Sequence, residues 1–217
     1  MKRIVCLIFP ILALLCSCED VADDYRYPSV ITDYACLITE AEGRPKKLNL
    51  DNGCTYPIEF TDEYNEAYEQ QPTYQADTVY RVITIYELAA DSVAYVYSMA
   101  PTVSFIPSRL RDGEVLRQDP VYLQSCWCSG GYLNVVIGLK ALDGKHSADF
   151  IDTTPDDMAG KEFTFYHNAN GDVEAYRQNL YGSIPLAPFE RELQQGDTLR
   201  LVVNEYDKGI TKYEFVL

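Results

Sequence analysis

Residues 121–139 of the chain read VYLQSCWCSGGYLNVVIGL, two apolar runs that meet at a pair of glycines. The first run extends from Val121 to Trp127, and the second, from Tyr132 to Leu139, is more densely apolar. Ser129-Gly130-Gly131 between them is a turn signal, because glycine adopts the positive φ angles of tight hairpins at little cost. The stretch therefore predicts two β-strands joined by a turn.

The rest of the second half repeats this pattern of strands and turns. Further strands are expected at residues 145–152, 161–167, 173–179, 197–205 and 211–217. In the last of these, apolar and polar residues alternate, which indicates one buried face. About seven short strands with turns every 8–12 residues are typical of a β-sandwich. We therefore predict an all-β fold in which residues 115–217 form a β-sandwich domain.

The first half predicts a smaller β-domain over residues 31–108. Its strands are expected at residues 34–39, 46–50, 54–60, 79–88 and 93–98, with a short helix at 61–71. Asp51-Asn52-Gly53 predicts a hairpin turn, and Pro57 favours an edge position for the third strand. Three strands, a helix and two more strands follow the order of an OB-fold, a five-stranded barrel. The proline-containing residues 100–120 are expected to link this barrel to the sandwich.

Residues 1–17 read as a signal sequence. Lys2 and Arg3 precede an apolar run, Ile4 to Leu15, that is shorter than the ~20 residues of a membrane-spanning helix. The run ends in Leu15-Cys16-Ser17-Cys18, which resembles the lipobox of bacterial lipoproteins. That resemblance implies that Cys18 is lipidated and becomes the first residue of the mature chain, with Cys16 a poorer alternative. An ordinary secretory signal with incidental cysteines is the other interpretation.

Residues 18–30 are acidic and lack periodicity, so we expect a flexible tether. The acidic run behind Cys18 resembles the signal that sends Bacteroidetes lipoproteins to the cell surface, although a solvated spacer would look the same. Removing residues 1–17 takes away Lys2 and Arg3 and no acidic residue, which moves the formal net charge from −15 to −17. Such a chain repels nucleic-acid phosphates and anionic headgroups, so no nucleic acid is expected as a partner and membrane attachment falls to the lipid. The expected location is the cell envelope, as an outer-membrane lipoprotein.

Five of the seven cysteines lie beyond residue 17. In an oxidising compartment, Cys36 and Cys54 are candidates for a disulfide, because both lie in the N-terminal block. Cys126 and Cys128 flank Trp127 on an expected strand, where both sulfurs point to one face and a bridge between them would be strained. We expect these two thiols to pack as small apolar side chains.

Two groups of residues are weak candidates for binding chemistry. Arg44, Lys46 and Lys47 form a basic cluster in the expected loop between the first two strands, where an anionic ligand could be contacted; solvated charge is the alternative. His146 and His167 are the only histidines.

If the two histidines faced one another, with Asp149 or Asp172 nearby, they would form a metal or acid–base site. Hydrogen bonds to backbone or turn groups are the alternative. The sequence has no Gly-x-Ser-x-Gly elbow, no phosphate-binding Gly-rich loop and no His-Glu-x-x-His. We therefore expect a non-enzyme with no cofactor, no catalytic residue and no resident metal.

Several stretches resemble the NigD-like family of Bacteroidetes lipoproteins. They are Trp127 with Ser129 to Asn134, His146 with the apolar strand after it, Phe165 to Asp172 and, more loosely, Leu48 to Gly53. The resemblance implies an N-terminal OB-like domain and a C-terminal β-sandwich, in agreement with the strand pattern. It implies no established activity, since the family name comes from a bacteriocin gene cluster in which an immunity or export role is an association. The chain departs from the family pattern at residues 61–78 and in its Cys-x-Cys at 126–128.

Two kinds of function remain. The first is a lipid-anchored, non-catalytic module that binds a protein or glycan, which predicts a concave aromatic patch. The second is a structural or accessory subunit of an envelope assembly, which predicts a large flat apolar patch or an edge strand that adds to a partner sheet. A bacteriocin-immunity role is a third, and it rests on the family resemblance alone.

Overall fold

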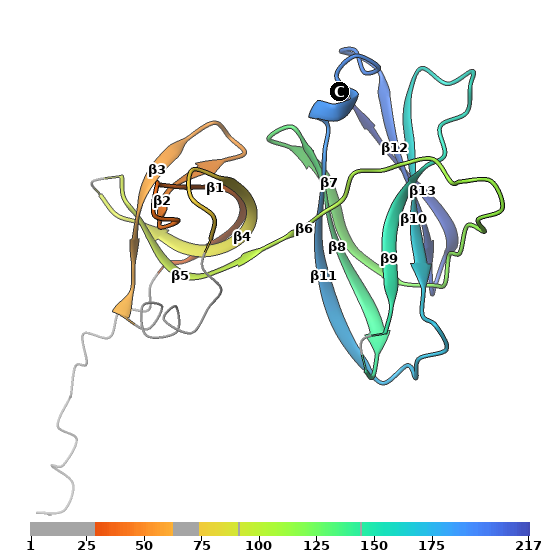
Figure 1. Cartoon of the computed structure of the whole chain (residues 1–217), viewed down its shortest axis with the longest axis horizontal. Helices are drawn as coiled ribbons and strands as arrows, with labels where there is room; N and C mark the ends of the chain where they lie inside the picture. The colour runs from red at the N-terminus through yellow and green to blue at the C-terminus, as the bar shows by residue number, and fades with distance from the viewer. Residues whose placement is uncertain (1–28, 63–73, 91, 144) are drawn as a thin grey trace, which may run out of the picture.

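The computed structural model describes residues 29–62, 74–90, 92–143 and 145–217. Its strands form a closed barrel and two further sheets, which confirms the predicted all-β fold of an OB-like barrel followed by a β-sandwich (Figure 1). In these ranges no helix is long and apolar enough to cross a bilayer. The signal sequence, Cys18, most of the acidic tether and most of the helix expected at 61–71 lie outside the described residues.

The barrel contains five strands: β1 (Ile31–Thr39), β2 (Pro45–Leu50), β3 (Thr55–Phe60), β4 (Val79–Leu88) and β5 (Ala94–Pro101). They close in the order β1-β2-β3-β5-β4, with β3 and β5 parallel, which is the arrangement of an OB-fold. Alternation along the strands turns Leu37, Leu48 and Val82 into the barrel, where they are fully buried. The predicted hairpin at Asp51-Asn52-Gly53 joins β2 to β3, and Gly53 adopts a φ of +87° there.

Strand β3 has neighbours on both sides, so the edge position inferred from Pro57 is wrong. The pairing of β3 with β2 runs from Thr55 to Pro57, whereas its pairing with β5 runs from Ile58 to Phe60. Pro57 thus lies where one neighbour ends and the other begins. The barrel closes there without the N–H group that proline lacks.

The sandwich packs two four-stranded sheets, in the orders β13-β12-β10-β9 and β6-β11-β8-β7. Its elements are β6 (Val103–Ser104), β7 (Tyr122–Ser129), β8 (Tyr132–Ala141), β9 (Ser147–Asp152), β10 (Gly160–Asn168), β11 (Tyr176–Pro185), the 3₁₀ helix η1 (Ala187–Phe189), β12 (Thr198–Glu205) and β13 (Gly209–Val216). Phe150, Phe163 and Phe165 from one sheet and Leu133 and Ile137 from the other fill the core. Strands β7 and β8 are the hairpin that residues 121–139 predict.

The chain enters the sandwich earlier than the sequence indicates. β6 pairs with β11, and Phe105 is buried in the sandwich core, so residues 103–108 belong with the second domain. The segment that follows is not a free linker. It makes isolated bridges to β9 at Ser108 and to β10 at Gln118. Its prolines suit a segment that follows a sheet without pairing continuously.

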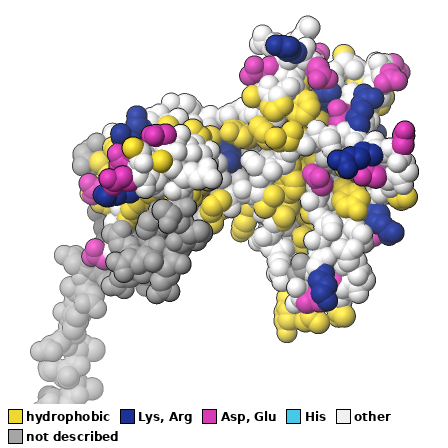
Figure 2. Space-filling view, viewed as in Figure 1, with side chains coloured by type: hydrophobic (Ala, Val, Ile, Leu, Met, Phe, Trp, Pro, Cys, Tyr) yellow, Lys and Arg dark blue, Asp and Glu magenta, His cyan; other side chains and the backbone are white. Residues whose placement is uncertain are grey.

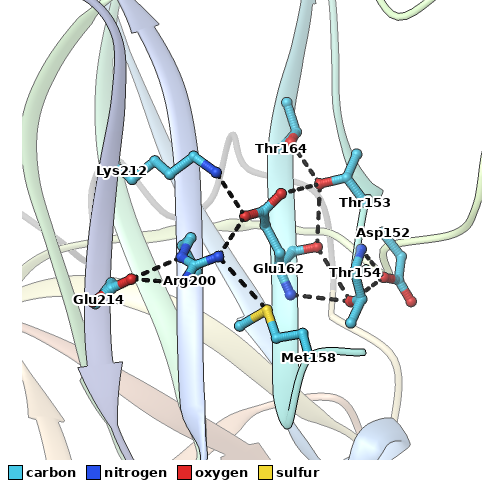
Figure 3. A network of polar contacts seen from close by, with 9 residues as sticks. All are labelled: Asp152, Thr153, Thr154, Met158, Glu162, Thr164, Arg200, Lys212 and Glu214. Carbon is cyan, nitrogen blue, oxygen red and sulfur yellow. Dashed lines mark hydrogen bonds and ion pairs between the residues drawn. The ribbon is translucent and has the colours of Figure 1, made fainter. Parts of the chain in front are cut away.

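The outer face of the sheet β13-β12-β10-β9 carries a network of charges (Figure 3). Glu162 on β10 accepts hydrogen bonds from Arg200 at 3.0 Å and from Lys212 at 3.1 Å, and Arg200 also binds Glu214. Burial opposes the ionisation of Glu162, but the two cations outweigh it and lower the pKa of this carboxyl. This part of the sheet surface is therefore charged and hydrogen-bonded rather than apolar.

A buried ion pair of the barrel lies at the junction of the two domains. Arg81 projects outward from β4, its side chain is 2% exposed, and its two terminal nitrogens lie 2.5 and 2.6 Å from the carboxylate oxygens of Asp51. Both residues belong to the barrel. One of the same nitrogens also donates to the side-chain oxygen of Asn134 on β8, at 3.0 Å, so the guanidinium is shared with the sandwich. Charged groups are buried at low cost only when they are paired and hydrogen-bonded.

The turn between β7 and β8 supplies the sandwich side of this contact. The Ser129 hydroxyl donates to Asp51, and the Tyr132 ring centroid lies 4.2 Å from the Arg81 guanidinium. Gly130, with a φ of +57°, approaches so closely that a Cβ there would lie 2.4 Å from an Asp51 carboxylate oxygen. The absence of a side chain at Gly130 therefore allows the sandwich hairpin to dock against the barrel hairpin.

Replacing Asp51 by Asn is expected to lower the free energy of unfolding by about 3 kcal/mol, because the buried Arg81 loses its counter-charge. Urea denaturation of the mature protein measures this loss. Glu42→Gln, which breaks an ion pair with Arg44 on the barrel surface, is the matched control and should cost less than about 1 kcal/mol. Small and equal losses in both variants would contradict a stabilising role for the Arg81–Asp51 pair.

Candidate functional site

A cleft of about 630 Å³ lies between the barrel and the sandwich, within the range of about 300–1,000 Å³ that is usual for ligand sites. Its lining residues come from both domains and include Tyr34, Asp51 and Asn52 of the barrel and Trp127 and Tyr181 of the sandwich. Figure 2 shows hydrophobic side chains at the surface where the domains meet, whereas charged side chains gather at the barrel end farther from the sandwich. The cleft is a concave aromatic patch of the kind that a binding module requires.

Trp127 faces the cleft because side chains alternate along β7. Cys126 and Cys128 pack against the sandwich core, so the residue between them points the other way, toward the barrel. The Trp127 ring meets the Tyr34 ring edge to face, with centroids 5.0 Å apart, and the Tyr34 hydroxyl donates to the Val135 carbonyl at 3.0 Å. Tyr34 belongs to the barrel and Trp127 to the sandwich, so this aromatic wall depends on the docking of the domains.

The predicted packing role of Cys126 and Cys128 is confirmed. Both thiols are half-buried against the sandwich core, and burial raises the pKa of each to about 11. They therefore stay protonated at neutral pH, and a thiol is a much weaker nucleophile and metal ligand than a thiolate.

The disulfide expected between Cys36 and Cys54 is not formed, which corrects that prediction. Cys36 lies on β1 opposite Asn49 and faces the domain junction, 3.7 Å from the Tyr132 hydroxyl. Cys54 is exposed just after the β2–β3 turn. The two cysteines are not neighbours in the fold. The strand register sets Cys36 opposite Asn49, which precedes the β2–β3 turn, whereas Cys54 follows that turn.

The basic cluster is not brought to the cleft. Arg44 pairs with Glu42 on the exposed β1–β2 turn, and Lys46 at the start of β2 lies 3.8 Å from Glu40. Lys47 is exposed as well, and none of the three cations lines the cleft. Their surroundings match the solvated-charge alternative.

His146 and His167 do face one another, and Asp172 extends the contact. His146 Nδ1 lies 2.8 Å from His167 Nε2, and His146 Nε2 lies 3.1 Å from Asp172 Oδ2. At the other end, His167 Nδ1 lies 2.9 Å from the Asp119 carbonyl oxygen. The His146, His167 and Asp172 side chains are all nearly buried.

One hydrogen in this chain of contacts follows from its end at Asp119. The Asp119 carbonyl only accepts, so His167 carries a hydrogen on Nδ1. The direction of the hydrogen bond between the two rings depends on their tautomers. Burial lowers the pKa of His167, and the neighbouring His146 adds to this effect, which favours a neutral ring at His167.

This geometry favours a hydrogen-bonding role for the histidines. Each ring nitrogen that a metal ion would need is directed at another protein atom. Among the residues that the structure describes, no group of three or more His, Cys, Asp or Glu side chains is arranged to hold a metal ion. The chain of contacts instead ties the end of β10 to the loops before β7, β9 and β11.

Two residues at the junction were not singled out from the sequence: Arg81 and Tyr181. Arg81 did carry a signal, since it is a single charge in the otherwise apolar run VYRVITIY of β4. Tyr181 carried none, because its position depends on how two separate domains meet.

The free energy of unfolding should depend on pH through the contacts of Asp172. Backbone N–H groups, that of Leu142 first, and the His146 side chain lower the pKa of Asp172. A lowered carboxyl pKa stabilises the folded state above the ordinary Asp range of about 4, and this contribution is lost as the pH falls through the folded-state pKa. Asp172→Asn should therefore be less stable than the wild type at pH 7, and the gap should narrow toward pH 3.

Urea denaturation at both pH values measures this gap. Asp157→Asn, at an exposed loop position, is the control and should show no gap at either pH. A gap for Asp172→Asn that stays constant from pH 7 to pH 3 would contradict the assignment.

Comparison with known proteins supports this architecture. The sequence profile of the NigD-like C-terminal β-sandwich domain matches residues 104–217. A NigD-like immunity protein from Bacteroides caccae is 24% identical, with a TM-score of 0.68 over 88% of this chain and 99% of that one. A protein of unknown function from Bacteroides vulgatus is 17% identical, with a TM-score of 0.66 over 87% and 91% of the two chains.

A third solved structure, a "putative lipoprotein" from Bacteroides fragilis, is 8% identical, with a TM-score of 0.56 over 87% of this chain and 96% of that one. At these identities the solved structures show the fold alone. No curated protein sequence matches the chain. The profile match spans more than half of the 217 residues, and the chain therefore belongs to the NigD-like family.

Proposed function

We propose that this chain is a lipid-anchored, non-catalytic recognition protein of the cell envelope, which binds a protein or glycan ligand in the cleft between its domains. The observation that carries the proposal is the cleft itself. Trp127 and Tyr181, both half-buried, supply apolar ring surface, and Asp51 and Asn52 supply polar groups that can orient a ligand. Ligand sites commonly combine an aromatic wall with a few convergent polar groups and lie between domains.

The alternative of a structural subunit is less well supported. Such a subunit would need a large flat apolar face for its partner. The outer face of the sheet β13-β12-β10-β9 instead carries the Glu162–Arg200–Lys212 network (Figure 3). A partner on this face would have to remove hydrogen-bonded charges from water, which is costly.

An immunity role is a second candidate. Its support is that the Bacteroides caccae structure is of a NigD-like immunity protein. Immunity would be a particular case of the proposed recognition, with a toxin as the protein ligand. Deletion of the gene, followed by challenge with bacteriocins of related strains, tests this role, and unchanged sensitivity to all of them would oppose it.

Trp127 makes the binding proposal testable, because it is the only tryptophan in the chain. A ligand that enters the cleft should change the intrinsic fluorescence of the mature protein. Candidates from peptide and glycan libraries that do so are then titrated by calorimetry. Trp127→Ala should weaken binding by about tenfold or more, as expected for a buried aromatic contact.

Tyr176→Ala is the matched control, since Tyr176 is a 70% exposed tyrosine of β11 that does not line the cleft. It should leave the affinity unchanged. If both variants lose affinity equally, or if bound ligands leave the Trp127 fluorescence unchanged, the cleft is not the binding site.

The anchor is tested separately. Cys18→Ser removes the proposed lipidation site. Without the lipid, the folded protein should move from the membrane fraction to the soluble fraction, because stable attachment to the membrane requires the acyl chains. The lipoprotein among the structurally similar proteins supports this location. Fractionation with antibody detection is the measurement, and a Cys18→Ser protein that remains in the membrane would refute lipid anchoring.

A further inference from the structure

We propose that the ligand of the interdomain cleft is a linear oligosaccharide that carries a carboxylate, and that it continues from the cleft along the outer face of the sheet β6-β11-β8-β7 to Arg177. This inference rests on the recognition function proposed above and specifies its ligand. It follows from the side chains that the sheet directs outward, from the unused donors of Arg177 and from the charges on this face.

The outer face of strands β7, β8 and β11 continues the wall of the cleft. Every second residue of β8 from Leu133 to Ile137 is buried in the sandwich core, so the residues between them point outward. Val136 is one of these, and it lines the cleft with its cross-strand neighbour Tyr181 and with Trp127. Beyond Val136 the same face continues to Lys140 for about 13 Å, at about 3.3 Å per residue, which is enough for about two more sugar units.

This continuation carries amide side chains. Gly138 of β8 pairs with Asn179 of β11, and Gln124 of β7 donates to the Asn179 side-chain oxygen at 2.5 Å. A Cβ at Gly138 would lie 3.2 Å from the same Gln124 nitrogen, so the amides meet over a position without a side chain. Both amides are exposed. An amide offers a donor and an acceptor, and so does each hydroxyl of a sugar. In the cleft, the Trp127 and Tyr181 rings have negative faces, which attract the C–H groups of a pyranose ring.

At the far end of the face, Arg177 presents a guanidinium with unused donors. Arg177 lies opposite Lys140 in the strand register and is exposed. Its guanidinium carbon lies 3.9 Å from the ring centroid of Tyr122. A guanidinium held over a ring keeps its N–H groups in its own plane, directed away from the ring. No hydrogen bond or ion pair to another described residue engages them. A carboxylate matches such a fork with two parallel hydrogen bonds.

Charge complementarity also favours a carboxylate at this end. Lys140 lies 3.1 Å from a Glu174 carboxylate oxygen, so these two charges balance. Arg81 and Asp51 balance in the same way beside the cleft. Arg177 therefore leaves one positive charge on the sheet face. The net charge of −15 repels an anion at longer range, so the acid group of the ligand must be held by direct contact with Arg177.

The placement of these groups favours a glycan over a peptide. A peptide that binds a sheet commonly adds a strand at the sheet edge, through backbone hydrogen bonds. Here the groups are side chains on the face of the sheet, and they follow one another as two rings, two amides and a guanidinium. A sugar chain has hydroxyls along its whole length for the amides, and a uronic acid unit supplies the carboxylate.

The test titrates the mature protein with a panel of linear uronic acid tetrasaccharides, each paired with its methyl ester, while Trp127 fluorescence is recorded. Esterification removes the negative charge and keeps the sugar chain. At least one acid should bind at least about tenfold more tightly than its ester. Arg177→Gln should reduce this preference to about twofold or less. Asn179→Ala should weaken the acid and the ester by the same factor, because its amide contacts hydroxyls that both possess.

Arg117→Gln is the control, since Arg117 is an exposed arginine beside the other sheet that forms no ion pair within the described ranges. It should keep the preference, and urea denaturation should show that all three variants are folded. Equal affinity of the wild type for acids and esters, a preference that survives Arg177→Gln, or its equal loss in Arg117→Gln would overturn the acidic glycan. Peptides that alter Trp127 fluorescence when no glycan does would also overturn it and leave the recognition function standing. Failure of every glycan and peptide to alter that fluorescence would overturn both.

Discussion

The buried guanidinium of Arg81 is the constraint on which the arrangement of the two domains depends. Strand β4 directs this side chain out of the barrel, and its side chain is 2% exposed. A guanidinium removed from water must be paired and hydrogen-bonded. Asp51 of the barrel pairs with its two terminal nitrogens, and the sandwich adds a hydrogen-bond acceptor, Asn134, and an aromatic ring, Tyr132. The favourable environment of Arg81 therefore exists only when both hairpins are docked.

The cleft is a consequence of that docking. Trp127 precedes the β7–β8 turn that contacts Asp51, and the alternation of β7 buries Cys126 and Cys128 in the sandwich while it turns Trp127 toward the barrel. The residues from Ser129 to Asn134, by which the chain resembles its family, therefore have a structural role in docking the two domains. The recognition proposed here also depends on side chains outside that stretch, such as Tyr181.

Features that depend on local sequence could be predicted, whereas features that depend on closure or docking could not. The alternating strands, the turn at Asp51-Asn52-Gly53 and the common face of Cys126 and Cys128 follow from periods of two residues and from glycine conformations. The edge position for Pro57 failed because barrel closure gave β3 a second neighbour. The domain boundary was misplaced because two residues, β6, join a sheet formed mainly by strands far along the chain. Arg81 and Tyr181 acquire their importance only from the opposite domain.

The role of the histidines, too, could be predicted only in part from the sequence. The sequence predicts a site only if the two rings face one another. The structure brings them together, but the hydrogen bonds at both ends of the pair link loops of the sandwich.

The arrangement of the two domains depends on their junction, and ¹⁵N relaxation of the mature protein tests this dependence most directly. The wild type should tumble with one rotational correlation time for barrel and sandwich, and Arg81→Leu should give two distinct times with both domains still folded. Separate tumbling in the wild type, or a single shared time in Arg81→Leu, would contradict the claim that this ion pair sets the domain arrangement.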